Sequence, residues 1–195
     1  QTVTRPINQF TLIGATTKSG MLSGPLRSRF GITERLDFYE DEELADIILQ
    51  SAQFLNIDID KKSAILIGSC ARGTPRIAKK ILRRIRDFAQ VNNKNVADLK
   101  LVKESLRFLG IDDDGLGIVD NLILSKIISN FNGGPVGLDT LASLIGEDAD
   151  TIETVYEPFL LRKGLLEKTP RGRQIAYQAL PHLKSKYQGQ KTLLK

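Results

Sequence analysis

The sequence predicts a mainly α-helical fold with a few short strands, divided between more than one domain. Of the 195 residues, 41% are hydrophobic and 26% are charged, a balance typical of a folded globular chain. The strand-like patterns lie at residues 10–17, 34–39 and 165–169, whereas helical periodicity dominates between residues 41 and 163. Residues 110–117 hold three acids and three glycines, which predicts a linker between two helical regions.

Composition excludes several classes of protein. No apolar run approaches the length of a membrane-spanning helix, and the first ten residues lack the pattern of a signal peptide. Cys70 is the single cysteine, so no internal disulfide can form and we expect a reducing, cytoplasmic environment. His182 is the single histidine, and we predict no metal site. The net charge of +5 favours an anionic partner only weakly.

Two strands are predicted near the start of the chain. Phe10–Thr17 is an apolar run that ends in two hydroxyls, and Glu34–Tyr39 alternates between polar and apolar residues. Ligands of nucleotide-binding α/β sheets lie beyond the carboxyl ends of the strands. Thr16 and Thr17 could therefore orient a water molecule near a phosphate. The alternative is a strand-ending turn whose hydroxyls are satisfied locally.

Helices are predicted from residue 41 onward. The first begins at Asp41, and a second is capped by Ser63 and ends at Cys70. The strongest signal follows Gly73, with Thr74 at the cap, Pro75 at the first helical position, and an apolar stripe to residue 89. A further helix covers about residues 96–109.

The last third of the chain has the element order of a winged helix. Helices are predicted at residues 122–131, 138–145 and 150–163, the last kinked by Pro158. A short strand at residues 165–169, a basic turn at residues 170–173 and an amphipathic tail helix follow.

Arginines stand at two positions suited to phosphate. Arg76 lies in the first turn of a helix, where the dipole disfavours a cation unless an anion is close. Arg27 and Arg29, in the segment GPLRSRF, are held between Pro25 and Phe30 just after the first predicted strand. An arginine supplied by a neighbouring subunit can stabilise phosphoryl transfer. The alternatives are a surface arginine on an ordinary capped helix and a salt-bridged loop.

Six segments together resemble the RuvB family, the hexameric AAA+ motors of bacterial Holliday-junction branch migration. They are LIGATT (12–17), PLRSRFG (25–31), GTPRIAKKIL (73–82), NGGPVGLDTLA (132–142), TIETVYEPFLLRKG (151–164) and TPRGR (169–173). The resemblance covers about residues 10–185, in order and at compatible spacings.

The resemblance implies roles for particular residues. Arg29 is similar to the arginine finger that acts on a neighbouring subunit, with Arg27 as the alternative, because Arg29 directly precedes the aromatic residue. Thr17, together with Thr16, is similar to sensor 1. Arg76 is similar to the sensor 2 arginine, with Thr74 and Pro75 beside it at the nucleotide. The implied cofactor is ATP or ADP with Mg²⁺.

The sequence departs from the family pattern at its most diagnostic point. No G-x-x-x-x-G-K-[ST] motif occurs, and Asp41 does not follow the apolar strand that a magnesium-binding acid requires. The hairpin that docks the RuvA partner is also missing from these residues. The resemblance therefore indicates the C-terminal part of such a motor, which we expect to hydrolyse no ATP alone.

Four regions are expected on this basis. Residues 1–40 correspond to the end of the large AAA+ ATPase subdomain, 41–112 to the helical lid, 113–187 to a winged-helix DNA-binding domain, and 188–195 to a tail. The resemblance also implies self-association into a hexameric ring, and no membrane partner.

The basic turn is the expected DNA contact. Arg171 and Arg173 flank Gly172 and are expected to project from the turn, with Lys168 and Lys163 adding charge. The implied ligand is the duplex arms of a Holliday junction, bound without sequence preference. Glu153 and Glu157 on the third helix suit base readout poorly. The alternative is a charged loop that binds no nucleic acid.

Other classes of protein fit part of the pattern. A non-catalytic winged-helix regulator with a helical dimerisation module explains the last third, and a clamp-loader or initiator ATPase shares the lid and the finger. The basic run from Arg72 to Arg86 suits a solvated face, a subunit interface or a DNA contact. The strings GGPVGLDTLA and TPRGR favour the RuvB family.

Overall fold

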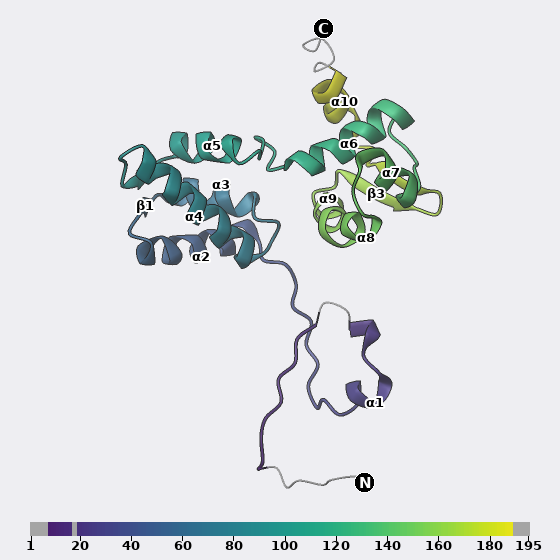
Figure 1. Ribbon diagram of the computed structural model, residues 1–195, viewed down its shortest axis with the longest axis horizontal. Coiled ribbons are helices and arrows are strands. Elements are labelled where there is room, and N and C mark those ends of the chain that lie inside the picture. Colours follow the sequence, from purple (N-terminus) through teal and green to yellow (C-terminus); the bar gives the residue numbers. More distant parts are fainter. Residues whose placement is uncertain (1–7, 17–18, 189–195) are drawn as a thin grey trace. The chain divides into compact units, whose positions relative to one another are not determined.

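The computed structural model describes residues 8–16 and 19–188 and confirms the mainly α-helical prediction. The chain divides into two compact units, Gln1–Asp37 and Phe38–Lys195. Within the second unit, Figure 1 shows helices α2–α5 in one group and helices α6–α10 in another. We name residues 38–112 the lid and residues 113–188 the winged helix. Among the described residues, no helix is both long and apolar enough to span a bilayer.

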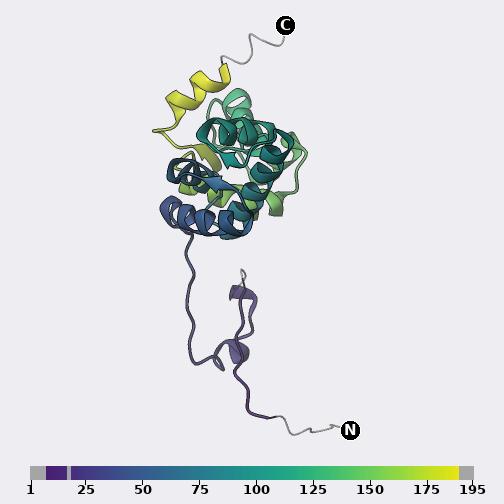
Figure 2. The same cartoon turned by 90° about the vertical axis from the view of Figure 1, so that its left-hand side faces the viewer.

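In the first unit, the described residues contain only two short helical turns, η1 (Ser19–Met21) and α1 (Gly24–Arg27). The prediction of strands at residues 10–17 and 34–39 is wrong for the described part of these segments, which is extended chain without strand pairing (Figures 1 and 2). Leu12, Ile13 and Leu36 are 61%, 88% and 93% exposed. An apolar segment becomes a strand only where a neighbouring strand takes its backbone hydrogen bonds. No described strand pairs with these two segments, and the N–H of Tyr39 binds the carbonyl of Gly73 in a loop instead.

The lid is built from four helices around one apolar core. They are α2 (Asp41–Phe54), α3 (Lys61–Ser69), α4 (Pro75–Val91) and α5 (Leu99–Phe108). Two-residue strands β1 (Asp58–Ile59) and β2 (Val96–Ala97) pair in parallel and tie the ends of α2 and α4 together. The core side chains come from the apolar stripes of all four helices: Leu44, Ile48, Ile67, Leu82, Ile85 and Leu101 are fully or almost fully buried.

Short polar side chains fix where the lid helices begin. Glu40 and Glu43 form a reciprocal capping box at the start of α2. The cap of α3 is Asp60, whose Oδ1 accepts the N–H of Ser63 at 2.6 Å, so the prediction that Ser63 caps this helix is wrong. Asp98 caps α5 in the same way, which moves its start beyond the predicted residue 96.

The winged helix has its own core. Its elements are α6 (Ile118–Phe131), α7 (Leu138–Ile145), α8 (Ala149–Thr151), the π-helical turn η2 (Ile152–Tyr156), α9 (Glu157–Arg162), strands β3 (Leu166–Thr169) and β4 (Gly172–Ile175), and α10 (Leu180–Gln188). The strands pair antiparallel from Leu166↔Ile175 to Thr169↔Gly172. Val136 adds a bridge to Arg173. The buried core includes Leu116, Ile123, Leu124, Ile127, Leu141, Ile152 and Leu160.

The third helix of this domain is interrupted where Pro158 was predicted to kink it. The turn before Pro158 widens into the π-helical segment η2, because proline supplies no N–H to the carbonyl one turn earlier. The interruption turns the backbone carbonyl of Val155 toward the lid, where a side chain of the lid binds it.

Candidate functional site

The arginine segment of the first unit is a single helical turn. Pro25 lies in the first turn of α1, and Phe30 places its ring beside Gly14, with Phe30 Cζ 3.5 Å from the position a Cβ would occupy there. Arg27 donates to the backbone carbonyl of Ser19 at 2.5 Å. Arg29 is exposed, and its guanidinium makes no hydrogen bond or ion pair with any described residue. The segment therefore holds Arg27 locally and leaves the Arg29 guanidinium available.

Of the two candidate sensor 1 threonines, the structure describes only one. Thr16 is exposed at the end of the extended run of residues 8–16, and Thr17 lies outside the described residues.

The loop before α4 presents the second candidate arginine. Thr74 stands at the cap position, but its hydroxyl donates to the carbonyl of Ala71 at 3.2 Å and does not cap the helix. Pro75 occupies the first turn, as predicted. Arg76 is exposed and makes no ion pair with any described residue. A helix N-terminus without a side-chain cap, next to an unpaired guanidinium, is suited to an anion.

Two consecutive residues of this loop adopt left-handed backbone conformations. Arg72 has φ = 55° and Gly73 has φ = 69°. The N–H of Tyr39 donates to the carbonyl of Gly73 at 3.0 Å. A Cβ at Gly73 would lie 2.3 Å from Arg162 Nη1 and 2.7 Å from Phe38 Cβ. The loop that carries Arg76 is therefore enclosed by the start of the lid and by the winged helix.

Arg72 crosses from the lid into the winged helix. Its Nη2 donates to Asp120 Oδ2 at 2.5 Å, and its Nη1 donates to the carbonyl of Val155 at 3.3 Å. The guanidinium also lies over the rings of Tyr156 and Phe159, 5.3 and 4.9 Å from their centroids. Four separate contacts therefore hold one lid side chain on the winged helix.

Asp120 is the buried partner in this joint. Its side chain is fully buried at the start of α6, where Oδ2 also accepts the N–H of Gly117 at 2.8 Å. Its Oδ1 has no hydrogen-bond partner among the described residues. Burial raises the pKa of Asp120, and the Arg72 guanidinium partly offsets this effect. The carboxylate therefore depends on Arg72 for its charge balance.

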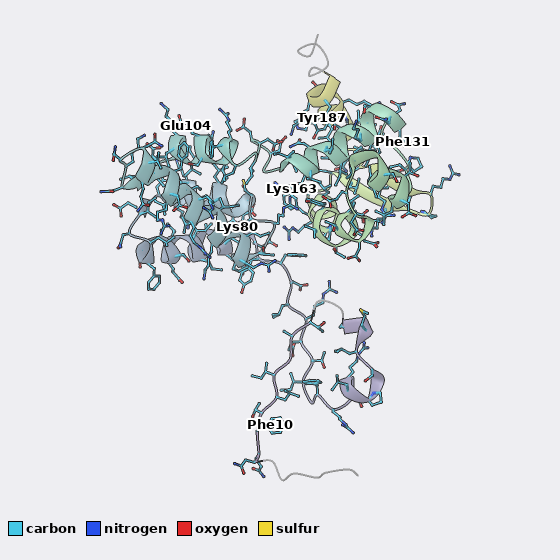
Figure 3. The ribbon with its side chains drawn as sticks, viewed as in Figure 1. Phe10, Lys80, Glu104, Phe131, Lys163 and Tyr187 are labelled. Carbon is cyan, nitrogen blue, oxygen red and sulfur yellow. The ribbon has the colours of Figure 1, made fainter. Side chains whose placement is uncertain are left out.

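A second group of contacts surrounds the linker between the domains. Asp112 Oδ1 accepts the N–H groups of Asp114 and Leu116, and its Oδ2 binds Asn121 and Lys186. Lys163, which Figure 3 labels between the two groups of helices, donates to the carbonyl of Asp114 at 2.9 Å. The linker predicted at residues 110–117 is thus an ordered turn, because its acids accept hydrogen bonds from both sides.

The wing is the hairpin between β3 and β4. Its turn is closed by Thr169, whose hydroxyl donates to the carbonyl of Gly172 at 2.9 Å and accepts the N–H of Arg171 at 3.2 Å. Gly172 has φ = 125°, and a Cβ there would lie 2.2 Å from the carbonyl oxygen of Val136. Arg171 is exposed at the tip and makes no ion pair with any described residue.

The expectation that Arg173 projects from the turn is wrong. Its side chain is only 14% exposed, and its Nε donates to the fully buried carboxylate of Glu157. Lys168 lies 2.9 Å from both Glu153 and Glu157, and these carboxylates raise its pKa. Arg173 is turned inward and Lys168 pairs with the same carboxylate from the surface, because the buried Glu157 at the start of α9 must be neutralised. Of the three predicted DNA contacts, only Arg171 is unpaired in the described chain.

Comparison with known proteins covers almost the whole chain. Family models match residues 1–36 as the Holliday junction DNA helicase RuvB P-loop domain, residues 39–112 as the RuvB AAA lid domain, and residues 113–184 as the RuvB C-terminal winged helix domain. A protein of Treponema denticola named Holliday junction branch migration complex subunit RuvB is 54% identical over 94% of this chain. The chain belongs to the RuvB family.

The match to RuvB proteins concerns their C-terminal portion. The chain spans 53% of the Treponema denticola RuvB and 50% of a Clostridium kluyveri RuvB that is 51% identical over 89% of this chain. The solved structure of the Thermotoga maritima RuvB Holliday junction branch migration motor superposes with a TM-score of 0.82 at 47% identity. The superposition includes 91% of this chain and 60% of the Thermotoga maritima chain.

Membership of the RuvB family decides between the classes considered from the sequence. The resemblance is confirmed, because the family models and the relatives described above all carry the name RuvB. Residues of the interdomain joint, by contrast, were missed at the sequence level. Asp120 could have been predicted from the sequence as a residue with a buried partner. It is a lone acid next to the apolar stripe of Ile123, Leu124 and Ile127, and a buried carboxylate must be paired.

Proposed function

We propose that this chain supplies the lid and the winged helix of an ATP-driven DNA translocase that drives Holliday-junction branch migration in recombination and repair. In this proposal, residues 1–40 complete a large ATPase subdomain, 41–112 form the lid, 113–187 bind DNA and 188–195 form a tail. The observation that carries it is the exposed, unpaired Arg171 at the wing tip of a chain matched along its length by RuvB family models.

Nucleotide is the proposed ligand of two arginines. Arg76 at the start of α4 is assigned to sensor 2, with Thr74 and Pro75 shaping the loop, and Arg29 is assigned to the finger that acts on a neighbouring subunit. Both guanidinium groups are exposed and unpaired in the described chain, which fits a polyphosphate. Arg27 is the weaker candidate because it already binds the Ser19 carbonyl.

ATP with Mg²⁺ would supply the terminal phosphate that these arginines meet. The described residues hold no group of three or more acidic, histidine or cysteine side chains placed to bind a metal ion. The residues proposed to face the nucleotide, Arg76 and Arg29, are cationic, and their proposed task is to neutralise charge on the phosphates. Thr17 and Thr16 remain candidates for sensor 1.

Duplex DNA is the proposed ligand of the wing. Arg171 is proposed to bind backbone phosphate, which makes the contact independent of sequence. Arg173 and Lys168 are proposed to shape the wing from behind, since both are held by Glu153 and Glu157. The further partners proposed are RuvA, other copies in a hexameric ring and the arms of a Holliday junction, all in the cytoplasm.

A salt titration of duplex binding tests the proposal. Fluorescence anisotropy is measured with two duplexes of unrelated sequence over a range of salt concentrations. We expect equal affinities for the two, and Arg171→Ala should weaken binding and reduce the slope of log K against log salt by about one. Lys103→Ala removes an exposed charge from α5 and should change neither quantity. Unchanged binding by Arg171→Ala, or a strong preference for one sequence, would count against the wing as the contact.

A further inference from the structure

Besides the contacts of Asp112 with Asn121 and Lys186 and that of Arg162 with Phe38, the lid is joined to the winged helix through Arg72. Arg72 contacts Asp120 at the start of α6, the Val155 carbonyl in the π-helical turn, and two aromatic rings around it. No other lid arginine is bonded to the winged helix in the described part of the chain except Arg107, whose partner Asp113 lies at the domain boundary.

The backbone at Arg72 is unusual for a residue with a side chain. A left-handed φ of 55° costs of the order of 1 kcal/mol for a residue other than glycine. The neighbouring Gly73 extends the same turn, which is closed by Tyr39 and Arg162. Together these two residues direct the Arg72 side chain into the winged helix while Arg76, four positions later, stays at the surface.

The elements that Arg72 contacts also bind the strands of the wing. Val155 and Tyr156 belong to η2, and the same turn and the start of α9 carry Glu153 and Glu157, which bind Lys168 and Arg173. A continuous series of contacts therefore runs from the loop of Arg76, through Arg72 and η2, to the strands that present Arg171. Packed side chains and ion pairs of this kind can carry energetic coupling between distant sites.

We propose that Arg72 is a positioning residue that fixes the winged helix on the lid, so that the loop carrying Arg76 and the wing carrying Arg171 move as one body. The inference rests on the proposed function in one respect: the roles of Arg76 at the nucleotide and of Arg171 at the DNA are taken from it. The rigid joint itself requires neither nucleotide nor DNA.

Distances between the two domains test the joint in the intact chain. Spin labels are attached at Gln50→Cys on α2 and Asp139→Cys on α7, both exposed positions. Cys70 stays in place, because it is buried and its burial raises the thiol pKa, which makes it slow to react. The distance distribution is recorded by pulsed electron spin resonance for the unsubstituted background, Arg72→Ala and the control Arg107→Ala, which loses an exposed ion pair.

The background and Arg107→Ala should give the same narrow distribution, and Arg72→Ala should broaden it severalfold with its helix content retained. The double variant Arg72→Met/Asp120→Leu leaves no buried unpaired charge and should broaden the distribution in the same way, which covers the case in which Arg72→Ala fails to fold. A narrow, unshifted distribution in the double variant overturns the proposal, as does a broad one in the background.

Duplex affinity, measured on the same samples, separates this inference from the proposed function. We expect Arg72→Ala to bind duplex as tightly as the background, because the wing is intact. A background that binds no duplex contradicts the proposed function, whereas the width of the distance distribution still decides the role of Arg72.

Discussion

At the scale of single residues, charge balance in buried places explains most of what the side chains do. Arg72 and Arg173 each neutralise a fully buried carboxylate, Asp120 and Glu157. Arg29, Arg76 and Arg171 have no such partner among the described residues and lie exposed. These five arginines therefore divide into two that neutralise buried carboxylates and three that are available to an external phosphate.

Removing Arg72 should destabilise the chain in a pH-dependent manner. Burial already raises the pKa of Asp120, and loss of the guanidinium raises it further. The buried carboxylate is then ionised and unpaired at high pH but protonated at low pH, so the loss of stability grows as pH rises. We expect Arg72→Ala to cost about 3–5 kcal/mol near pH 8 and clearly less near pH 5, measured by urea unfolding.

Arg107→Ala provides the comparison, since its ion pair with Asp113 is exposed on both sides. It should change the free energy of unfolding by less than about 1 kcal/mol at either pH. An equal loss for Arg72→Ala at both pH values would show that Asp120 does not titrate in this way.

At the scale of elements, the wing and the third helix form one unit. Glu157 is buried at the start of α9 because Pro158 and η2 place it under the hairpin, where Arg173 and Lys168 reach it. Gly172 closes the opposite side by allowing the strand to approach the Val136 carbonyl. The shape of the wing therefore depends on its contacts with Glu157 and Val136, and Arg171 at its tip remains available to a ligand.

The two wing arginines should differ in their effect on stability. Arg173→Ala leaves the buried Glu157 with Lys168 alone and should cost about 1–3 kcal/mol in the free energy of unfolding. Arg171→Ala removes an exposed side chain without an ion pair and should change it by less than about 0.5 kcal/mol. Urea unfolding of the two variants checks this, and equal stability of the two would contradict the burial of Glu157.

The sequence was sufficient to predict those elements that are determined by local features such as caps, periodicity and turn residues. The helix after Thr74–Pro75, the helix at residues 138–145 and the hairpin around residues 170–173 follow from caps, periodicity and turn residues, and they form where predicted. The strands at residues 10–17 and 34–39 do not form in their described part, because strand formation depends on a partner strand elsewhere. The inward turn of Arg173 was hidden for a similar reason, since Glu157 is distant in sequence and its burial is a tertiary property.

At the scale of the whole molecule, the contacts between two cores connect the candidate phosphate site at Arg76 to the candidate DNA contact at Arg171. The lid core and the winged-helix core are separate clusters of buried side chains. Arg72 joins them next to Arg76, and η2 continues the contact to the wing. In a motor, this arrangement would let a movement at the nucleotide displace the DNA contact by the same amount, because the lid and the winged helix would not move relative to each other.

Arg29 is proposed to act as the arginine finger of an ATP-driven motor, and ATP hydrolysis by a chimera tests this proposal most directly. The chimera joins the preceding, P-loop-bearing part of Thermotoga maritima RuvB to this chain, which is 47% identical to the corresponding part of that protein. We predict that the chimera hydrolyses ATP and that Arg29→Ala lowers the rate by roughly 10³-fold or more with nucleotide binding retained, whereas Arg27→Ala has a small effect. An Arg29→Ala chimera that hydrolyses ATP as fast as the unsubstituted one would contradict the account.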